Sequence, residues 1–359
     1  MFIGIDHGTT GIRFALLENT CSSADSETSA RIYEISRESA ASLREREILR
    51  EIEHAFGVKL SDVKLVAVSY SMGDGISKIT DLHAAKNRGL REEVAAAGLE
   101  VGGGTRVFDA IKSSGVPAVL IPGIHADLHS LDRRMRFFSH GASPEKVGIA
   151  YYIFKKGFKD FIFSDVSSNT VSVAVAGGEI AGAIDACIFA PGLIQGPLDL
   201  QLLREVQKGL LSANEAFSSA GVLRKFGFQR LTAAEMQKQT QKQGRGRREA
   251  RGAAEGASDA FETLALFVAM EISALLVLLR DLASTAKIHI FLTGSVGESE
   301  KFRRSVDNLL RKLFTCDEAC KGRILEVQTL TRHSAAIGCA EIARDVFNGQ
   351  KRILGIEVD

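Results

Sequence analysis

Apolar residues recur along the chain in short blocks, and the spacing within each block predicts the element that it forms. Blocks that alternate or run on for roughly four to eight residues are typical of strands, whereas apolar positions three and four apart are typical of helices. The strands predicted in the first part of the chain are residues 2–5, 11–17, 31–36, 63–70 and 116–123. One amphipathic helix is predicted over residues 38–56 and a short helix over residues 101–115. This order of strands and helices predicts an α/β layer arrangement.

The first strand pair has a second copy further along the chain. The segment "FIGIDHGTTGIRFALLE" (residues 2–18) aligns without a gap with "FIFSDVSSNTVSVAVAG" (residues 161–177), so that Asp6 matches Asp165. Each unit predicts a strand, a turn and a strand, with an acid leaving the first strand, and a third strand over residues 178–189 follows the second copy. Two such units facing each other would aim two acidic, hydroxyl-rich hairpins into one cleft. Because strand patterns are degenerate, a chance match is the alternative.

The last part of the chain predicts a strand, a glycine turn and a helix start over residues 287–299, a strand over residues 322–330 and a closing helix over residues 333–347. The most apolar helix candidate covers residues 264–279 and contains Glu271. It is shorter than the ~20 residues of a membrane span, so a buried core helix is predicted, with Glu271 as a paired core acid.

An insertion is predicted over residues 191–258, and its stretch over residues 237–258 is polar and basic. Such a composition cannot build a core, which predicts a solvated or flexible loop. The alternative is a nucleic-acid or partner contact through the four arginines of the stretch, Arg245, Arg247, Arg248 and Arg251.

Composition adds limits to this picture. A chain of 359 residues with 45% apolar content can bury a large core and is expected to form two domains, residues 1–142 and residues 143–359. The net charge of +1 gives no general field for nucleic acid or a membrane surface, so neither is expected as a partner. Five cysteines, an odd number, and the absence of a secretory leader favour a reducing cytoplasm over a disulfide framework.

The two hairpins have the chemistry of a metal nucleotide site. Glycine-containing turns point several backbone N–H groups the same way, which suits phosphate oxygens, and serine and threonine hydroxyls add donors. An aspartate beside such a turn repels phosphate but attracts Mg²⁺. The alternative for Asp6 is a turn in which its carboxylate caps its own backbone. In "LTGSVGE", Gly294 and Gly297 would let an adenosine moiety approach the backbone, beside the N-terminus of the next helix.

The order of these motifs resembles the actin, sugar kinase, Hsp70 and acetate kinase superfamily, with its phosphate-1, phosphate-2 and adenosine motifs. The resemblance implies a two-lobed, ribonuclease H-like fold with mixed sheets flanked by helices and a nucleotide cleft between the lobes. It implies that Asp6 and Asp165 orient Mg²⁺. The residues that it assigns to the phosphate turns are Gly8, Thr9, Thr10, Ser167, Ser168, Asn169 and Thr170, and those of the adenosine turn are Gly294, Ser295 and Gly297. The phosphate-2 motif of the superfamily usually has glycines where this chain has residues 167–169. The side chains at these positions put in doubt how closely a γ-phosphate can approach the backbone of the turn.

A closer resemblance is to the methanogenesis marker protein 12 family of archaea. It is carried by "MFIGIDHGTTGIRFALLE", "DLHAAKNRGL", "SDVSSNTVSV", "GAIDACIFAPGLIQGPLDL" and "FLTGSVGE", and runs end to end apart from the basic stretch. In addition, "FFSHGASPEKVGIA" resembles the segment at which acetate and butyrate kinases hold the transferring phosphoryl group, which implies that role for His140 although Ser139 interrupts the motif.

Two further acids are candidate catalytic residues. Asp127 would be a base facing the cleft, as an acid near this point is in butyrate kinases, and Asp74 in "MGDGI" follows a buried strand between flexible glycines. The alternative for Asp74 is a turn aspartate. His125 and His129 have the spacing of two zinc ligands on a helix, but no glutamate follows His125 and the segment favours a loop or a cleft lining.

Two functional hypotheses follow. The first is an ATP-binding kinase or ATPase of the acetate or butyrate kinase type, associated with methanogenesis, with ATP and Mg²⁺ as cofactors and a small-molecule acceptor. The second is an ATP-gated chaperone or assembly protein for a methanogenesis enzyme such as methyl-coenzyme M reductase, in which hydrolysis switches lobe closure. The kinase hypothesis predicts ATP turnover that rises sharply when one small metabolite is added. The switch hypothesis predicts slow ATP turnover and a protein partner that stays bound to the chain. Acetate-kinase relatives pair through their second lobe, which implies a homodimer.

Overall fold

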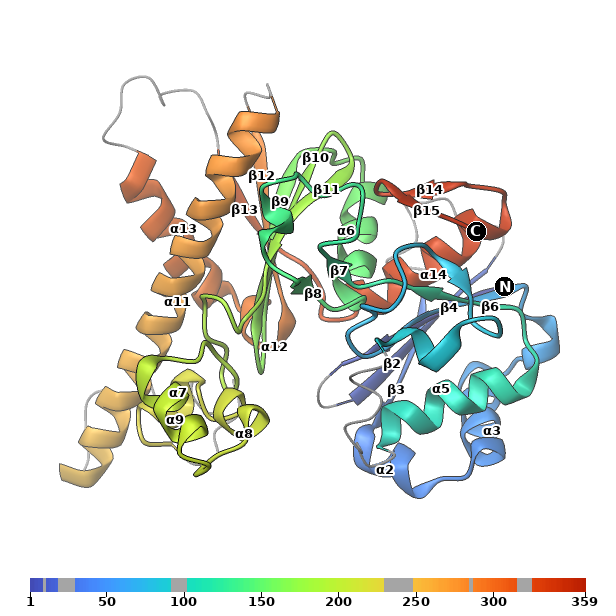
Figure 1. Cartoon of the computed structure of the whole chain (residues 1–359), viewed down its shortest axis with the longest axis horizontal. Helices are drawn as coiled ribbons and strands as arrows, with labels where there is room; N and C mark the ends of the chain where they lie inside the picture. The colour runs from blue at the N-terminus through green and yellow to red at the C-terminus, as the bar shows by residue number, and fades with distance from the viewer. Residues whose placement is uncertain (9–10, 19–29, 92–101, 229–247, 284–286, 315–324) are drawn as a thin grey trace. The chain divides into compact units, whose positions relative to one another are not determined.

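The chain divides into two compact units, which the computed structural model describes over residues 1–8, 11–18, 30–91, 102–228, 248–283, 287–314 and 325–359 (Figure 1). The first unit comprises Met1–Lys159, Val175–Ala181 and His333–Asp359, and the second comprises Asp160–Ala174 and Gly182–Arg332. Asp6 therefore belongs to the first unit and Asp165 to the second.

The first unit is built on a six-stranded sheet in the order β3-β2-β1-β4-β6-β5. Its strands are β1 (Phe2–His7), β2 (Gly11–Leu17), β3 (Arg31–Ser36), β4 (Leu65–Ser69), β5 (Thr80–Asp81) and β6 (Ala118–Ile121). The two hairpin pairs, β1 with β2 and β2 with β3, are antiparallel, and β1, β4 and β6 run parallel. These central strands are buried along their whole length, because helices cover both faces of the sheet.

One face of this sheet packs against α3 (Glu45–Phe56) and α5 (Gly103–Ser114), whose buried Ile52 and Phe108 belong to the same core cluster as Ile5 and Val68 of the strands. The helix α14 (Ser334–Phe347) contacts β1, β2 and β4 and lies on the other side of the sheet from α5 (Figure 1). The short elements of this unit are 3₁₀ turns η1 (Leu60–Asp62), η2 (Lys86–Gly89) and η3 (Met135–Phe137), and strands β7 (Ile124–His125), β8 (His140–Ala142), β14 (Arg352–Ile353) and β15 (Ile356–Glu357).

The single helix predicted over residues 38–56 is wrong, because the structure has two helices there. The first, α2 (Arg37–Ser42), is capped by Ser36, whose side chain accepts from the N–H of Ser39. The backbone of Leu43 is extended, and a second helix, α3, starts after Arg44, whose N–H donates to Glu47 Oε2 at 2.8 Å. The strands predicted over residues 11–17 and 31–36 are confirmed with the predicted bounds.

The first unit also includes α6 (Glu145–Lys155), which packs along α14. The two helices cross so closely that a Cβ on Gly338 would lie 1.8 Å from the carbonyl oxygen of Gly148, so glycine is required at this crossing. This grouping differs from the domain boundary predicted at residues 142 and 143. The closing helix α14 packs on the N-terminal strands β1 and β2, and no local sequence pattern predicts this long-range contact.

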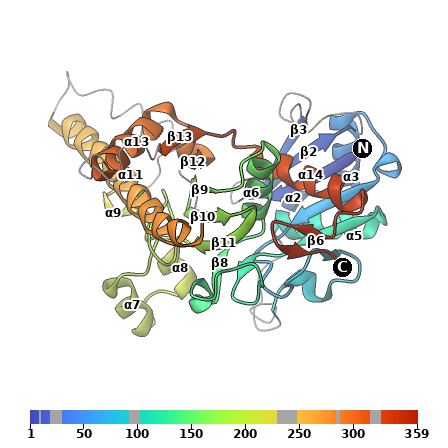
Figure 2. The same ribbon diagram turned by 90° about the horizontal axis from the view of Figure 1, so that it is seen from above.

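The second unit contains most of a five-stranded sheet in the order β11-β10-β9-β12-β13, and the labels of Figure 2 follow this order. Its strands are β9 (Phe161–Val166), β10 (Thr170–Ala176), β11 (Glu179–Ile184), β12 (Ile288–Thr293) and β13 (Leu325–Thr329). The central strand β9 runs parallel to β12, which runs parallel to β13. The helices α11 (Arg248–Leu282) and α13 (Glu300–Phe314) pack against each other, α11 also contacts β9, and α13 contacts β13.

The insertion predicted over residues 191–258 folds in part. It contains α7 (Leu200–Gln207), α8 (Ala213–Phe217) and α9 (Val222–Lys225), and Leu202, Ala216 and Ala220 form a small core there. The basic stretch was predicted to be a loop over residues 237–258, but from Arg248 onward it is the beginning of α11. Residues 237–247, with Arg245 and Arg247, lie outside the described residues.

The apolar helix α11 has two kinds of face. Leu264, Val268, Ile272 and Leu279 are buried, as predicted for a core helix, whereas Leu266, Met270 and Val277 are exposed. Among the described residues, the part Gly256–Leu282 is one helix whose length and hydropathy would suffice to cross a membrane, and 56% of its most apolar window is buried in the protein. Its burial against β9 and α13 is typical of a core helix in a soluble protein.

Candidate functional site

The first hairpin holds Asp6 at the end of β1, opposite Arg13 on β2. The Nη1 atom of Arg13 donates a 2.9 Å hydrogen bond to Asp6 Oδ2, and Asp6 is 1% exposed. Burial raises the pKa of Asp6 to about 6, although the positive charge of Arg13 opposes that shift. The other carboxylate oxygen, Oδ1, is buried without a hydrogen-bond partner among the described residues. Arg13 was not singled out from the sequence, but an acid and a base placed symmetrically about a hairpin turn signal such a pair.

Two more charged residues near Asp6 were also missed. Lys146, 3% exposed at the start of α6, has its Nζ 2.8 Å from Glu145 Oε1. Both act on Asp6, because the charge of Glu145 raises its pKa and that of Lys146 lowers it. A lysine inside the apolar run "EKVGIAYY" is the sequence signal that could have found this pair. In the turn itself, the Gly8 carbonyl accepts from Arg37 Nε at 2.8 Å. Thr9 and Thr10 lie outside the described residues.

His7 fixes the end of β1 to the elements beside it. Its Nδ1 contacts the carbonyl oxygen of Ser69 at the end of β4, and its Nε2 lies 3.1 Å from the carbonyl oxygen of Gly104 in α5. Burial, with the nearby charge of Arg37, lowers the pKa of His7 to about 4. Through its contacts with β4 and α5, His7 positions the first hairpin.

The second hairpin and the glycine turn after β12 meet inside the second unit. Asp165 on β9 pairs in register with Thr293, the last residue of β12. Ser167 Oγ donates to Asp165 Oδ1 at 3.1 Å and accepts from the Ser295 N–H at 3.0 Å. Gly294, the first residue of α12 (Gly294–Gly297), has φ +89°, and a Cβ there would lie 2.3 Å from both Asp165 Oδ1 and Ser167 Oγ. Only glycine permits this approach.

Hydrogen bonds to residues 191–195 hold the rest of the second turn. Thr170 Oγ1 donates to the Pro191 carbonyl at 2.7 Å, and the Ser168 carbonyl accepts from the N–H groups of Ile194 and Gln195, each at 2.9 Å. The side chains of Ser168 and Asn169 form no hydrogen bond within the described part of the chain.

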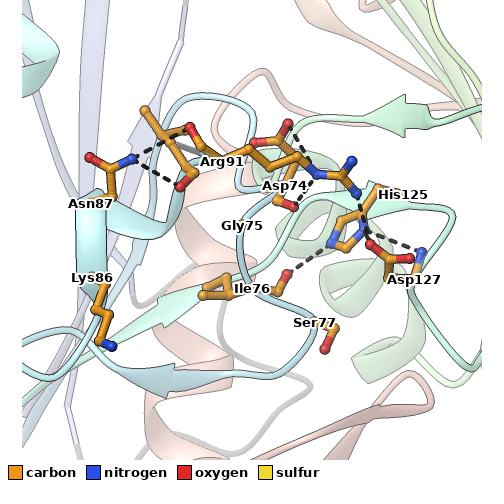
Figure 3. A pocket seen from close by; sticks show the side chains of 10 residues that line it. Asp74, Gly75, Ile76, Ser77, Lys86, Asn87, Arg91, His125 and Asp127 are labelled. Carbon is orange, nitrogen blue, oxygen red and sulfur yellow. Dashed lines mark hydrogen bonds and ion pairs between the residues drawn. The ribbon is translucent and has the colours of Figure 1, made fainter. Parts of the chain in front are cut away.

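A cavity of about 710 Å³ lies within the first unit and contains both further candidate acids, Asp74 and Asp127 (Figure 3). Arg91 joins them, because its Nη2 donates to Asp127 Oδ2 at 2.8 Å and its Nε donates to the Asp74 carbonyl at 3.2 Å. The remaining lining residues are Gly75, Ile76, Ser77, Lys86, Asn87, Leu90 and His125. Sequence reasoning found the two acids but not Arg91, which is 36 residues from Asp127.

His125 is 1% exposed and its tautomer follows from its contacts. Its Nε2 lies 2.8 Å from the Ile76 carbonyl oxygen, which can only accept, and its Nδ1 accepts from the Asp127 N–H at 3.4 Å. His125 therefore donates from Nε2 and accepts at Nδ1, which also lies 3.7 Å from Asp127 Oδ2, and it is a positioning residue of the cavity wall. Within the described residues, no group of three or more histidines, cysteines or acids is placed to hold a metal ion.

His140 lies on β8, directly opposite His125 on β7. It is partly buried, and it is not among the residues that line the cavity. The strand ends at Ala142, three residues before α6 and its Glu145–Lys146 pair.

Glu271 on α11 is the buried acid of the second unit. Its Oε2 accepts from the Ala190 N–H at 3.0 Å, and burial, reinforced by the charge of Asp185, raises its pKa to about 8. The expectation of a hydrogen-bonded core acid is confirmed for Oε2, whereas Oε1 has no partner among the described residues.

Comparison with known sequences finds close relatives over the whole chain. The chain is 46% identical over 362 residues to a UPF0285 protein of Methanosarcina mazei, covering 100% of this chain and 99% of the relative. A UPF0285 protein of Methanococcus maripaludis is 39% identical, over 99% of this chain and 99% of the relative. One of Methanocaldococcus jannaschii is 40% identical, over 99% of this chain and 98% of the relative. No model of a protein family matches. Because these relatives carry the name UPF0285, the finer resemblance to the methanogenesis marker protein 12 family stays a prediction.

Comparison with solved structures identifies the fold. The chain is similar to a propionate kinase of Francisella tularensis, with a TM-score of 0.61 and 13% identity, over 96% of this chain and 98% of that one. It is equally similar to an acetate kinase of Porphyromonas gingivalis, with a TM-score of 0.60 and 11% identity over the same shares. The predicted α/β fold of the actin-like kinase type is confirmed. At these identities the likeness concerns the fold alone.

Proposed function

The chain belongs to the UPF0285 family of methanogenic archaea, and from that premise and its kinase-like fold we propose that it is an ATP-dependent phosphotransferase. The observation that carries the proposal is the junction of the second hairpin with the glycine turn. Ser167 Oγ bridges Asp165 and the N–H of Ser295, and the bare Cα of Gly294 lets the two turns touch. The repeated hairpin and the "LTGSVGE" turn, separate in sequence, thus form one polar surface.

The residues present suit a nucleotide. Ser168 and Asn169 bring side-chain donors with no partner among the described residues, and backbone N–H groups of tight turns bind phosphate oxygens. We propose that Ser167, Ser168, Asn169 and Thr170 hold the phosphates and that Gly294, Ser295 and Gly297 approach the adenosine. Gly8, Thr9 and Thr10 would hold phosphate from the first unit.

The residues also suit Mg²⁺. Asp6 has a buried oxygen that accepts no hydrogen bond from the residues that the structure describes, and a hydrated cation would give it a partner. We propose that Asp6 in the first unit and Asp165 in the second each orient Mg²⁺ through carboxylate oxygens. When bound, Mg·ATP supplies the transferable phosphoryl group and neutralises its charge. Arg13 keeps part of the Asp6 population ionised despite burial, and His7 keeps the hairpin in place.

A thermal-shift titration of the full chain tests nucleotide binding. A ligand at ~100 times its Kd adds about 2.7 kcal/mol of stability, so Mg·ATP is expected to raise the Tm of the wild type. Asp6→Asn and Asp165→Asn should each remove the Mg²⁺-dependent part of that rise. The matched controls are Asp62→Asn and Asp259→Asn, exposed acids of the first and second units, which should retain it.

Two outcomes contradict the proposal. If Mg·ATP leaves the Tm unchanged, the chain does not bind the nucleotide. If both site variants keep the full Mg²⁺-dependent rise, the two hairpins are not the metal site. Turnover assays with small-molecule acceptors then separate a phosphotransferase from an ATPase, since only the first transfers label from γ-³²P-ATP to the acceptor.

A further inference from the structure

The cavity of the first unit has the size and construction of a metabolite site. Its volume of about 710 Å³ is within the ~300–1,000 Å³ range of small-molecule pockets. Three chain segments build it: residues 74–77 after β4, residues 86–91, and the end of β7 with Asp127, which adds His125 (Figure 3). All three segments belong to the first unit.

Arg91 is held in the cavity with one edge of its guanidinium free. Nε and Nη2 are fixed by the Asp74 carbonyl and the Asp127 carboxylate, whereas Nη1 makes no hydrogen bond among the described residues. The side chain is 43% exposed, so the free edge is open to a ligand. A planar guanidinium already oriented by two contacts binds a carboxylate or phosphate group with little further loss of entropy.

Asp74 provides the opposite chemistry beside Arg91. Its Oδ1 is buried with no donor in the described structure, and its Oδ2 lies 4.0 Å from Arg91 Nε, beyond hydrogen-bond distance. A largely buried carboxylate that accepts no hydrogen bond is costly, and a hydroxyl or ammonium donor from a ligand would relieve that cost. The site therefore has a cation, Arg91, for an acid group of a ligand, and beside it an acceptor, Asp74, for a hydroxyl or ammonium donor.

Hydrogen bonds within the chain hold the segment that supports Arg91. Asn87 Nδ2 donates to the carbonyls of Leu90 and Arg91, at 3.3 and 3.4 Å, and the Gly75 N–H donates to the Gly89 carbonyl at 3.0 Å. Arg88 adds two hydrogen bonds of 2.9 Å to the carboxylate of Asp109 on α5. These contacts within the chain fix the wall of the cavity that carries Arg91.

We propose that this cavity binds a small molecule that has both an acid group and a hydrogen-bond donor, the chemistry shared by hydroxy acids and amino acids. The acid group pairs with the free edge of Arg91, and the hydroxyl or ammonium donates to Asp74. A simple fatty acid leaves Asp74 Oδ1 without a donor, and a polyol offers no acid group to the Nη1 edge of Arg91, whose Nη2 is already paired with Asp127. That this ligand is the phosphoryl acceptor rests on the proposed function, whereas the binding itself does not.

Calorimetric titration without nucleotide tests the assignment with probes of equal carbon number. D-glycerate (acid and hydroxyls) and L-alanine (acid and ammonium) are compared with propionate (acid only) and glycerol (hydroxyls only). At least one of the first two is expected to bind roughly tenfold or more tightly than propionate and glycerol, the ratio for one charge-assisted hydrogen bond. Which of the two binds more tightly identifies a hydroxyl or an ammonium as the donor.

Substitutions of Arg91 and Asp74 test whether the probe binds in this cavity. Arg91→Gln and Asp74→Asn should each weaken the better probe by about tenfold or more. Arg91→Lys keeps the charge without the planar fork and should fall between. Arg46→Gln and Asp62→Asn, exposed residues of the same unit, are the controls and should leave the Kd unchanged. A melting curve for each variant shows that it is folded.

The proposal is overturned if neither glycerate nor alanine binds more tightly than propionate, or if Arg91→Gln and Asp74→Asn bind the better probe as well as the wild type. These outcomes are separate from failure of the proposed function. A chain that binds the probe in this cavity but shows no Mg·ATP shift retains the ligand site and loses the phosphotransferase.

Discussion

Asp6 and Arg13 face each other in register across the first hairpin and are joined by a 2.9 Å hydrogen bond. Burial favours the neutral form of Asp6, while Arg13 favours the charged form, and the balance raises the pKa of Asp6 to about 6. The acid is therefore mostly ionised at pH 7, but only because Arg13 is present. Glu34 lies 3.5 Å from Arg13 Nε, so the guanidinium keeps a second carboxylate partner if Asp6 changes.

Removing Arg13 should raise the pKa of Asp6 further, so that Asp6 ionises at higher pH. An acid whose pKa is higher in the folded than in the unfolded chain makes stability fall as pH rises from the ordinary value, 3.8, through the folded value of about 6. In Arg13→Gln that fall should continue above pH 6, and the cost at pH 8 should exceed that at pH 5 by about 1–3 kcal/mol. Tm measurements from pH 5 to pH 8 test this.

The double variant Asp6→Asn, Arg13→Gln is the control for that experiment. Without an ionisable group at position 6, the additional pH dependence caused by Arg13→Gln should disappear. If it persists in the double variant, some group other than Asp6 is responsible and the pairing does not control the titration.

The two glycines of α12 should respond oppositely to alanine. A Cβ on Gly294 would lie 2.3 Å from Asp165 Oδ1, at φ +89°, whereas a Cβ on Gly297 meets nothing nearer than 3.5 Å. Gly294→Ala is expected to destabilise the chain by about 2–4 kcal/mol and to abolish the Mg·ATP shift. Gly297→Ala, a helical position with space, should be neutral or stabilising by up to ~1 kcal/mol. Equal effects of the two changes in denaturant unfolding would contradict the close approach of the two turns.

Glu271 predicts a second pH dependence, in the other unit. Its pKa is about 8 in the folded chain against 4.5 ordinarily, so its contribution to stability is greatest below pH 4.5 and is lost as pH rises through 8. Glu271→Gln cannot ionise and should gain stability relative to the wild type as pH rises from 5 to 9, on the order of 1–3 kcal/mol. The difference in Tm between the two proteins isolates this residue, and a difference independent of pH would show that Glu271 does not titrate there.

Local patterns predicted the elements better than the contacts between them. The strand bounds of β2 and β3 follow directly from apolar alternation, and the acid of each hairpin was found because the repeat keeps it in place. The break before α3 was missed because it involves the hydrogen bond from the Arg44 N–H to the Glu47 carboxylate, which apolar spacing does not report. The Arg91–Asp127 pair joins irregular segments with no periodicity, so the cavity became visible only in three dimensions.

His140 separates the two functional classes that the sequence left open. It lies on β8, just before the helix that brings Glu145 and Lys146 near Asp6. As a donor to the phosphoryl group in transfer, it predicts that His140→Ala lowers kcat by about 10²–10³ and leaves ATP affinity unchanged. In an ATP-gated protein the same change would instead weaken ATP-dependent closure, measured by small-angle scattering. His129→Ala, an exposed histidine of the preceding segment, is the control and should alter none of the three quantities. If turnover, affinity and closure are all unchanged in His140→Ala, His140 is not part of the site, and the similarity of its segment to that of acetate kinases no longer supports a kinase.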